Sequence, residues 1–174
     1  MKILLTFTLA ILCQIGHADE GAIDVAKTHL DSNLKGDYKK LTKTYAPKIN
    51  LMAGHEFLKE EYGLAGAGGR AKGGEVERGK LIEAMTKASA DRPERPQERV
   101  EKMLKSLRYE VIEVQKGDFV TEASDPVGTP DGKLHFSIKK GDVLLKVSPP
   151  KGDFLLLHLR KKAGEWSVVS EYLD

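Results

Sequence analysis

The spacing of the apolar residues changes once along this chain, near residue 108. Before that point apolar side chains recur every three or four residues, as in a helix that buries one face. After it they alternate with polar residues, as in a strand that is buried on one side. This order predicts an α+β fold, with N-terminal helices packed on one face of a curved antiparallel sheet.

Two helices are expected at the start of this domain. The first covers residues 20–35 and stops at Gly36, because glycine readily ends a helix. Asp37 can cap a second, short helix, and Pro47 ends it. The apolar face of the second helix is expected to consist of Tyr38, Leu41 and Tyr45.

The middle of the chain has weaker signals. A strand is expected at residues 49–51, whereas residues 55–62 fit either a short helix or a strand. Residues 63–74 carry six glycines and are expected to form a loop. Helices at 75–90 and 97–107 follow and form a helical insertion at about 75–107.

The alternating segments predict six strands, separated by turns rich in glycine, aspartate and proline. These strands are 109–114, 119–123, 134–138, 143–147, 154–159 and 166–172. The first two are expected to form a hairpin through Lys116-Gly117-Asp118, so that the sheet is an antiparallel meander.

The first 18 residues have the pattern of a cleaved signal peptide. Lys2 precedes an apolar run, residues 3–13, and Gly16-His17-Ala18 offers small residues for cleavage after Ala18. The run is too short for a permanent membrane span. We therefore expect an exported protein, periplasmic or secreted, with a single domain at residues 19–174. Because the one cysteine, Cys13, lies in the leader, the mature chain has no disulfide.

Charge and motifs argue against several function classes. The chain has 28 basic and 26 acidic residues, so that loss of Lys2 leaves a net charge of about +1 and no field to attract nucleic acid. Gly66 to Ala71 matches a dinucleotide fingerprint but lacks a preceding strand. His55-Glu56 begins a zinc motif, but Lys59 stands where its second histidine belongs. No cofactor and no metal are expected.

Three segments resemble the nuclear-transport-factor-2-like superfamily of cystatin-like α+β cones. They are residues 34–41 around Gly36-Asp37, residues 41–47 ending in Tyr45-Ala46-Pro47, and residues 164–169 with Gly164-Glu165-Trp166. Residues 54–107 are not covered. The resemblance implies a curved sheet and helices that form a cone with a pocket at its wide end. Its members include isomerases and dehydratases as well as exported binding domains, so fold alone does not give function.

The candidate pocket residues are aromatic or polar side chains on otherwise apolar strand faces. On the strands they are Tyr109, His158, Trp166 and Tyr172, and Tyr45 of the second helix is a further candidate. The alternation puts His158 on one face with Leu156, and Trp166 and Tyr172 on one face with Val168. A histidine in such a strand is more often a satisfied structural residue than a base.

The leading hypothesis is an exported domain without evident catalytic machinery, which binds a small apolar or amphipathic molecule or a protein partner. Catalytic family members typically place an acid after the Tyr-Ala pair, where this chain has Pro47, Lys48 and Asn50. The first alternative is a small acid–base isomerase or dehydratase, with His158 as base and Tyr109 as hydrogen-bond donor. The second is a homodimeric structural module that uses the open face of the sheet.

Overall fold

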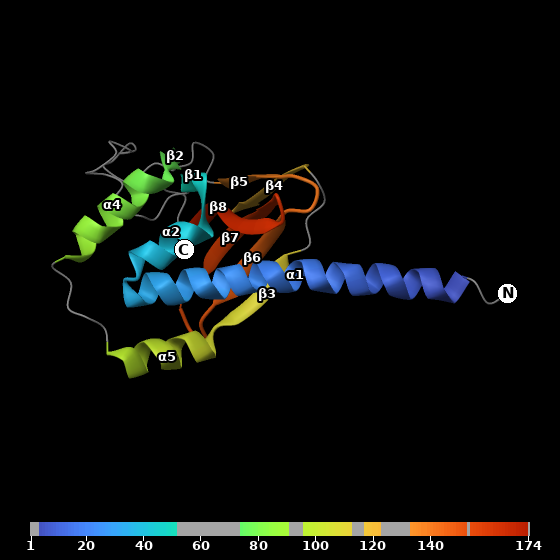
Figure 1. The fold of residues 1–174 in the computed structure, drawn as a ribbon, viewed down its shortest axis with the longest axis horizontal. Coiled ribbons are helices and arrows are strands. Elements are labelled where there is room, and N and C mark those ends of the chain that lie inside the picture. The colour runs from blue at the N-terminus through green and yellow to red at the C-terminus, as the bar shows by residue number, and fades with distance from the viewer. Residues whose placement is uncertain are drawn as a thin grey trace.

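The computed structural model describes residues 4–51, 74–90, 96–112, 117–122, 133–152 and 154–173, with side chains from Glu20 onward except at residues 88, 118–122, 133–135 and 173. The helices are α1 (Leu4–Lys35), α2 (Tyr38–Thr44), α4 (Arg78–Ser89) and α5 (Gln97–Ser106). The strands are β1 (Tyr45–Leu51), β2 (Gly74–Glu77), β3 (Arg108–Ile112), β4 (Gly117–Glu122), β5 (Lys133–Ile138), β6 (Val143–Ser148), β7 (Leu155–Lys162) and β8 (Glu165–Leu173). Figure 1 shows their arrangement and confirms the predicted α+β class.

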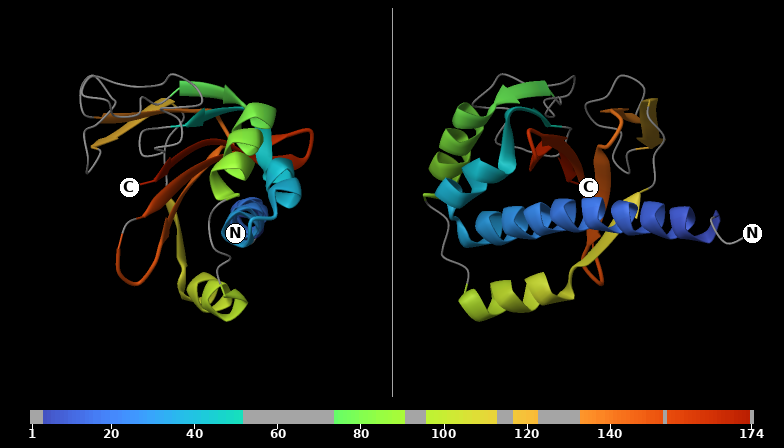
Figure 2. Two further views of the ribbon diagram at one scale, coloured as in Figure 1. Left: turned by 90° about the vertical axis from the view of Figure 1, so that its left-hand side faces the viewer. Right: turned by 45° about the vertical axis from the view of Figure 1, so that its right-hand side comes forward.

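The main sheet has six strands in the order β2-β1-β8-β7-β6-β3. Its neighbours are antiparallel except β1 and β8, which run parallel, so the sheet is mixed rather than purely antiparallel. Strands β4 and β5 form a separate antiparallel pair. In Figure 2, α1, α2 and α4 lie on one side of the main sheet and the β4–β5 pair lies on the other.

The predicted hairpin between the strands at 109–114 and 119–123 is wrong. Strand β3 pairs instead with β6, with Tyr109 opposite Val147 and Val111 opposite Leu145. This pairing adds two apolar β3 side chains to the core beneath the helices. Burial against a distant strand therefore outweighs proximity in the sequence.

The junction between α1 and α2 follows from two residues, as predicted. Gly36 has φ +70, and its N–H donates to Asn33 O, while Asp37 N–H donates to Ser32 O. This pair of bonds ends a helix in the Schellman pattern, which favours glycine at the position with positive φ. Asp37 then accepts a hydrogen bond from Lys40 N and caps α2.

Two predicted boundaries are wrong for one reason. Tyr45 begins β1 rather than completing the apolar face of α2, and residues 74–77 form β2 rather than the start of a helix at 75–90. In both cases the residues join the sheet, because strand pairing there buries apolar side chains: Tyr45 is buried, and Val76 pairs with Ile49. Pro47 lies where the register of β1 against β8 shifts, a place that tolerates its missing N–H.

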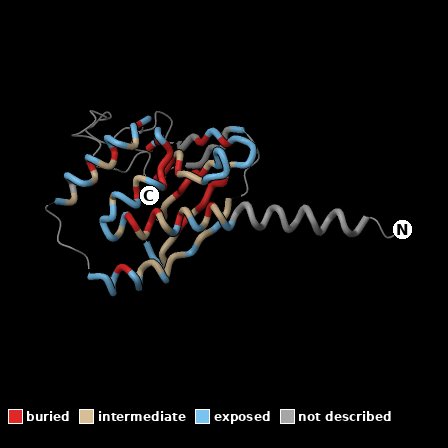
Figure 3. The backbone as a smooth tube through the Cα atoms, in the orientation of Figure 1, coloured by how far each residue is buried: buried red, intermediate tan, exposed pale blue. Residues whose placement is uncertain are grey.

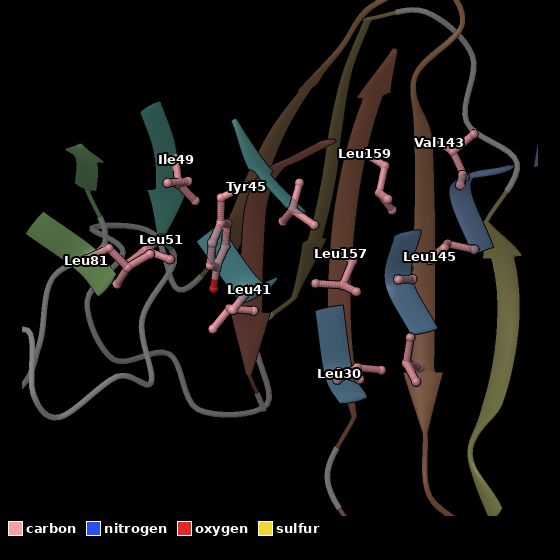
Figure 4. Close-up of a cluster of buried hydrophobic side chains, with 14 of the residues drawn as sticks. Leu30, Leu41, Tyr45, Ile49, Leu51, Leu81, Val143, Leu145, Leu157 and Leu159 are labelled. Carbon is pink, nitrogen blue, oxygen red and sulfur yellow. The ribbon is translucent and has the colours of Figure 1, made fainter. Parts of the chain in front are cut away.

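The main sheet buries apolar side chains on both faces. Buried residues concentrate along its central strands in Figure 3. On the helix side, the core extends from Leu51 and Leu81 through Leu41 and Tyr45 to Leu157 and beyond (Figure 4). On the other side, five residues form a second core: Phe136, Ile138, Leu144, Leu156 and Tyr172. We call these the helix-side core and the hairpin-side core.

Some predicted segments lie outside the described residues, namely the ambiguous stretch at 55–62 and nearly all of the glycine-rich stretch at 63–74. The predicted helix at 20–35 is the second half of α1, which also includes most of the predicted leader. Among the described residues, no helix is both long and apolar enough to cross a membrane. Export stays a prediction.

Candidate functional site

The five candidate pocket residues do not meet at one place. Tyr45, Tyr109 and Trp166 belong to the helix-side core or its margin. His158 and Tyr172 are on the other side of the sheet, where Tyr172 joins the hairpin-side core. His158 lies there too, because its cross-strand neighbour is Leu144, a member of that core.

A register shift in β8 explains why Tyr172 does not share a face with Trp166. Val168 pairs with Leu159, but the next pair joins Ser170 to His158, so that Val169 is an extra residue. Such a bulge reverses the alternation of the residues after it. The predicted common face of Trp166, Val168 and Tyr172 is therefore wrong, and the alternation of apolar residues gave no sign of the bulge.

His158 is 3% exposed and is hydrogen-bonded to a carboxylate. Its Nε2 lies 2.8 Å from Oδ2 of Asp142, at the turn between β5 and β6. Its ring also meets the ring of Phe136 edge-on at 6.3 Å. Burial lowers the pKa of His158, and the Asp142 hydrogen bond opposes that shift only in part. A neutral imidazole that donates Nε2–H to Asp142 fits this environment.

Asp142 holds the end of the sheet together. Its carboxylate accepts hydrogen bonds from Arg160 Nε at 3.0 Å and Arg160 Nη2 at 2.7 Å, and from Lys139 N at 2.8 Å. Burial disfavours the charged carboxylate, but these bonds and that of His158 together keep the pKa of Asp142 below its ordinary value. The geometry is that of an oriented, saturated carboxylate that links the β5–β6 turn to β7.

The acid–base alternative required His158 and Tyr109 to reach one substrate atom. These side chains lie on opposite faces of the main sheet, so they cannot act together in a single site. His158 Nδ1 has no hydrogen-bond partner among the described residues, but this nitrogen lies within a buried residue.

A second buried polar cluster lies in the helix-side core and was missed by sequence reasoning. Tyr45 donates to Oε2 of Glu171 at 2.9 Å, and His29 Nε2 lies 3.3 Å from the same oxygen. His29 Nδ1 lies 2.9 Å from the hydroxyl of Thr44. All four residues are buried. The one sequence feature that could have indicated this cluster is Glu171, an acidic residue within the otherwise apolar last strand.

The hydrogen bonds assign the donors in this cluster. The hydroxyl of Thr44 donates to Leu41 O, so its oxygen accepts a hydrogen bond from His29 Nδ1–H. Nε2 is then the ring atom that faces the Glu171 carboxyl, 3.3 Å away. Burial, and next the charge of Glu171, raise the pKa of Tyr45 well above 10.0, so the phenol stays protonated. The cluster joins α1, α2, β1 and β8.

Tyr109 lies at the margin of the helix-side core, where coverage is incomplete. Three further apolar side chains at this place are half-buried: Leu104, Leu107 and Val111. We call these four residues the β3 margin. The ammonium of Lys27 lies 5.9 Å from the Tyr109 ring centre, and burial raises the pKa of Tyr109. The margin thus combines apolar area, a phenol and one cation.

Trp166 serves the packing of α1 onto the sheet. A Cβ added at Gly21 would lie 3.0 Å from the indole Nε1, so the glycine allows the helix to approach closely. On its other side, the ammonium of Lys161 lies 5.8 Å from the ring centre.

Within the described ranges, no group of three or more histidine, cysteine or acidic side chains has the arrangement of a metal site. The buried acids Asp142 and Glu171 are instead hydrogen-bonded by neighbouring side chains.

Comparison with known proteins finds several similar solved structures, among them the following three. A protein of unknown function with a cystatin-like fold from Nostoc punctiforme is 15% identical, with TM-score 0.37, over 89% of this chain and 88% of that one. An NTF2-like protein of unknown function from Shewanella baltica is 11% identical, with TM-score 0.44, over 93% and 95%. An NTF2-like protein from Burkholderia xenovorans is 13% identical, with TM-score 0.35, over 89% and 90%.

These descriptions name the fold family that the sequence resembles. At such identities they carry no activity over to this chain. No family model matches the chain, and no curated protein matches it in sequence.

Proposed function

We propose that this chain is an exported domain that binds a small amphipathic molecule with an anionic head, and that it has no acid–base catalytic pair. The observation that carries the proposal is the β3 margin beneath Lys27. Deeper in the helix-side core, Leu51, Leu81 and Ile49 are fully buried. At the margin, half-buried apolar side chains remain in contact with water.

Burial of this remaining apolar area supplies the driving force for an alkyl chain, at roughly 25 cal/mol per Å². Lys27 supplies the preference for an anion. Its present partner is Asp24, whose carboxylate lies 3.7 Å away and is largely exposed. Exposed pairs of this kind contribute little, so the ammonium can turn to a ligand carboxylate without loss of stability.

We propose no acid–base pair because the buried acids Asp142 and Glu171 already accept hydrogen bonds from neighbouring side chains. Asp142 is bound by Arg160 and His158, and Glu171 accepts from Tyr45. The only two side chains that the sequence offered as base and donor are separated by the sheet. An acid–base enzyme therefore has less support than a binding domain.

Decanoate and decanol test the ligand class, because they share a tail and differ in the head group. We expect both to raise Tm, decanoate more, and Lys27→Gln to remove the difference between them. Tyr109→Ala should weaken both. The matched control is Lys161→Gln, which removes a lysine that lies at a similar distance from the ring of Trp166. It should leave the Tm shifts caused by decanoate and by decanol unchanged. A Tm unmoved by either compound would refute the proposal.

Export is tested separately by the intact mass of the chain made with its own N-terminus in a bacterial host. Cleavage after Ala18 gives a product that starts at Asp19. A product that keeps Met1 would contradict export through this leader.

A further inference from the structure

Strand β3 is one edge of the main sheet, and within the described residues no strand pairs with its outer side. An edge strand presents unpaired backbone N–H and C=O groups that another strand can use. The side chains of β3 alternate: Tyr109 and Val111 are half-buried on the helix side, whereas Arg108 and Glu110 are exposed.

We propose that β3 pairs antiparallel with β3 of a second copy of this chain, in a register centred on Tyr109. In this register the two Tyr109 residues lie opposite each other. Arg108 of each copy lies opposite Glu110 of the other, and Leu107 opposite Val111. A two-fold interface must be complementary to itself, and this five-residue segment meets that condition at every position.

Charge on the neighbouring strand supports the same register. Glu110 is opposite Lys146 of β6, whereas Arg108 is opposite Ser148. Among the described residues no ion pair is seen for Arg108, so each copy would supply the acid that the other lacks. Glu110 would then lie between two cations, one from each copy.

Strand β2, at the opposite end of the described strand order, has a charge pattern that disfavours self-pairing. Strand β2 exposes Glu75 and Glu77 on either side of Val76. The equivalent self-pairing, centred on Val76, would set Glu75 of one copy against Glu77 of the other, and like charges directly opposite are destabilising. The two edges thus differ in charge complementarity: opposed charges attract across a self-paired β3 and repel across a self-paired β2.

This proposal shares Tyr109, Leu107 and Val111 with the β3 margin but does not rest on ligand binding there, because strand pairing is made by the backbone edge of β3 and can be measured without a ligand. Light scattering after size-exclusion chromatography, over a range of concentrations, should give twice the chain mass for the wild type. Arg108→Glu should weaken the dimer about tenfold, since two attractive pairs become repulsive. The double variant Arg108→Glu/Glu110→Arg should restore it.

Lys102→Glu, an exposed change of the same kind on α5, is the matched control and should leave the dimer intact. Thermal unfolding by circular dichroism checks that each variant is folded. A wild type that stays monomeric, or a dimer that is indifferent to the single and double reversals, overturns the proposal.

A crosslink tests the register itself. In a Cys13→Ser background, Tyr109→Cys should form an intermolecular disulfide on mild oxidation, because directly opposed residues of antiparallel strands have Cα atoms about 4.5–5.5 Å apart. Glu110→Cys is offset from its own copy and should remain reduced. Crosslinking at position 110 but not 109 would overturn this register.

Discussion

The hydroxyl of Tyr45 donates a hydrogen bond of 2.9 Å to Oε2 of Glu171, across 126 positions of the sequence. Tyr45 begins β1 and Glu171 lies near the end of β8, so the bond joins the one parallel pair among the described strands of the main sheet. His29 on α1 approaches the same oxygen. One carboxylate oxygen therefore marks where the first helix, the first strand and the last strand meet.

Tyr45→Phe should destabilise the fold by about 1–3 kcal/mol, because a buried carboxylate loses a donor while the ring still fills its space. The free energy of unfolding in urea measures the effect. Tyr38→Phe is the control, since Tyr38 is only half-buried and should change stability by less than about 0.5 kcal/mol. Equal losses in the two variants would contradict a special role for the Tyr45 hydroxyl.

Asp142→Asn should cost about 3 kcal/mol, because the Arg160 guanidinium and His158 lose a shared, buried acceptor. Asp31→Asn is the matched control: Asp31 also contacts two side chains, Lys35 and Lys40, but its side chain is 26% exposed rather than 2%. Urea unfolding of both variants compares them. A smaller loss for Asp142→Asn than for Asp31→Asn would disprove the assignment.

The pKa of His158 predicts a dependence of stability on pH. Burial lowers this pKa from 6.5, so below pH 6.5 the unfolded chain takes up a proton that the folded chain does not. Stability should therefore fall as the pH drops from neutral through this value. In His158→Gln, which keeps an N–H donor toward Asp142, this part of the slope should vanish. Identical slopes in urea unfolding at several pH values would rule out the contribution.

Gly21→Ala should destabilise by about 1 kcal/mol, because the added methyl group meets the Trp166 indole at 3.0 Å and this outweighs the gain in helix propensity. Gly79→Ala, at the start of α4, is the control. A Cβ at Gly79 meets nothing within 4 Å, so the change should be neutral or slightly stabilising. A higher Tm for Gly21→Ala than for the wild type would indicate that the Trp166 indole moves aside at little cost.

Ala163→Gly should stabilise the β7–β8 hairpin by about 0.5–1 kcal/mol, since Ala163 has φ +52, a left-handed conformation that strains an alanine. Gly164, with φ +90, completes the turn, and Gly164→Ala should destabilise it. Urea unfolding of the two variants should thus shift in opposite directions. Shifts of the same sign would argue against strain at this turn.

Local signals explain what could be predicted from the sequence. Gly36-Asp37 predicted a helix end and a cap that involve only residues within one turn. The stripe on residues 97–107 predicted α5, and the alternation after residue 108 predicted the strands of the meander from β6 to β8. Each depends on spacing along the chain, which the sequence displays directly.

Other features depend on which strand lies beside which. The extra residue Val169 reverses the face of Tyr172 and separates it from Trp166. Strand β3 pairs with β6 rather than with the next strand, and Tyr45 belongs to β1 rather than to the predicted helix. All five candidate residues therefore lie in strands, but on two faces of the sheet that the sequence could not distinguish.

The amino-acid order alone determined the α+β class, the helix junction at Gly36 and the strand segments from β3 to β8, because propensity, capping and periodicity act over a few neighbouring residues. Only the tertiary structure decided the pairing of β1 with β8, the place of β3 at an edge among the described strands, and the partners of Asp142 and Glu171. Those outcomes arise from contacts between distant segments, whose free energy depends on register and joint burial and leaves no mark in any local pattern.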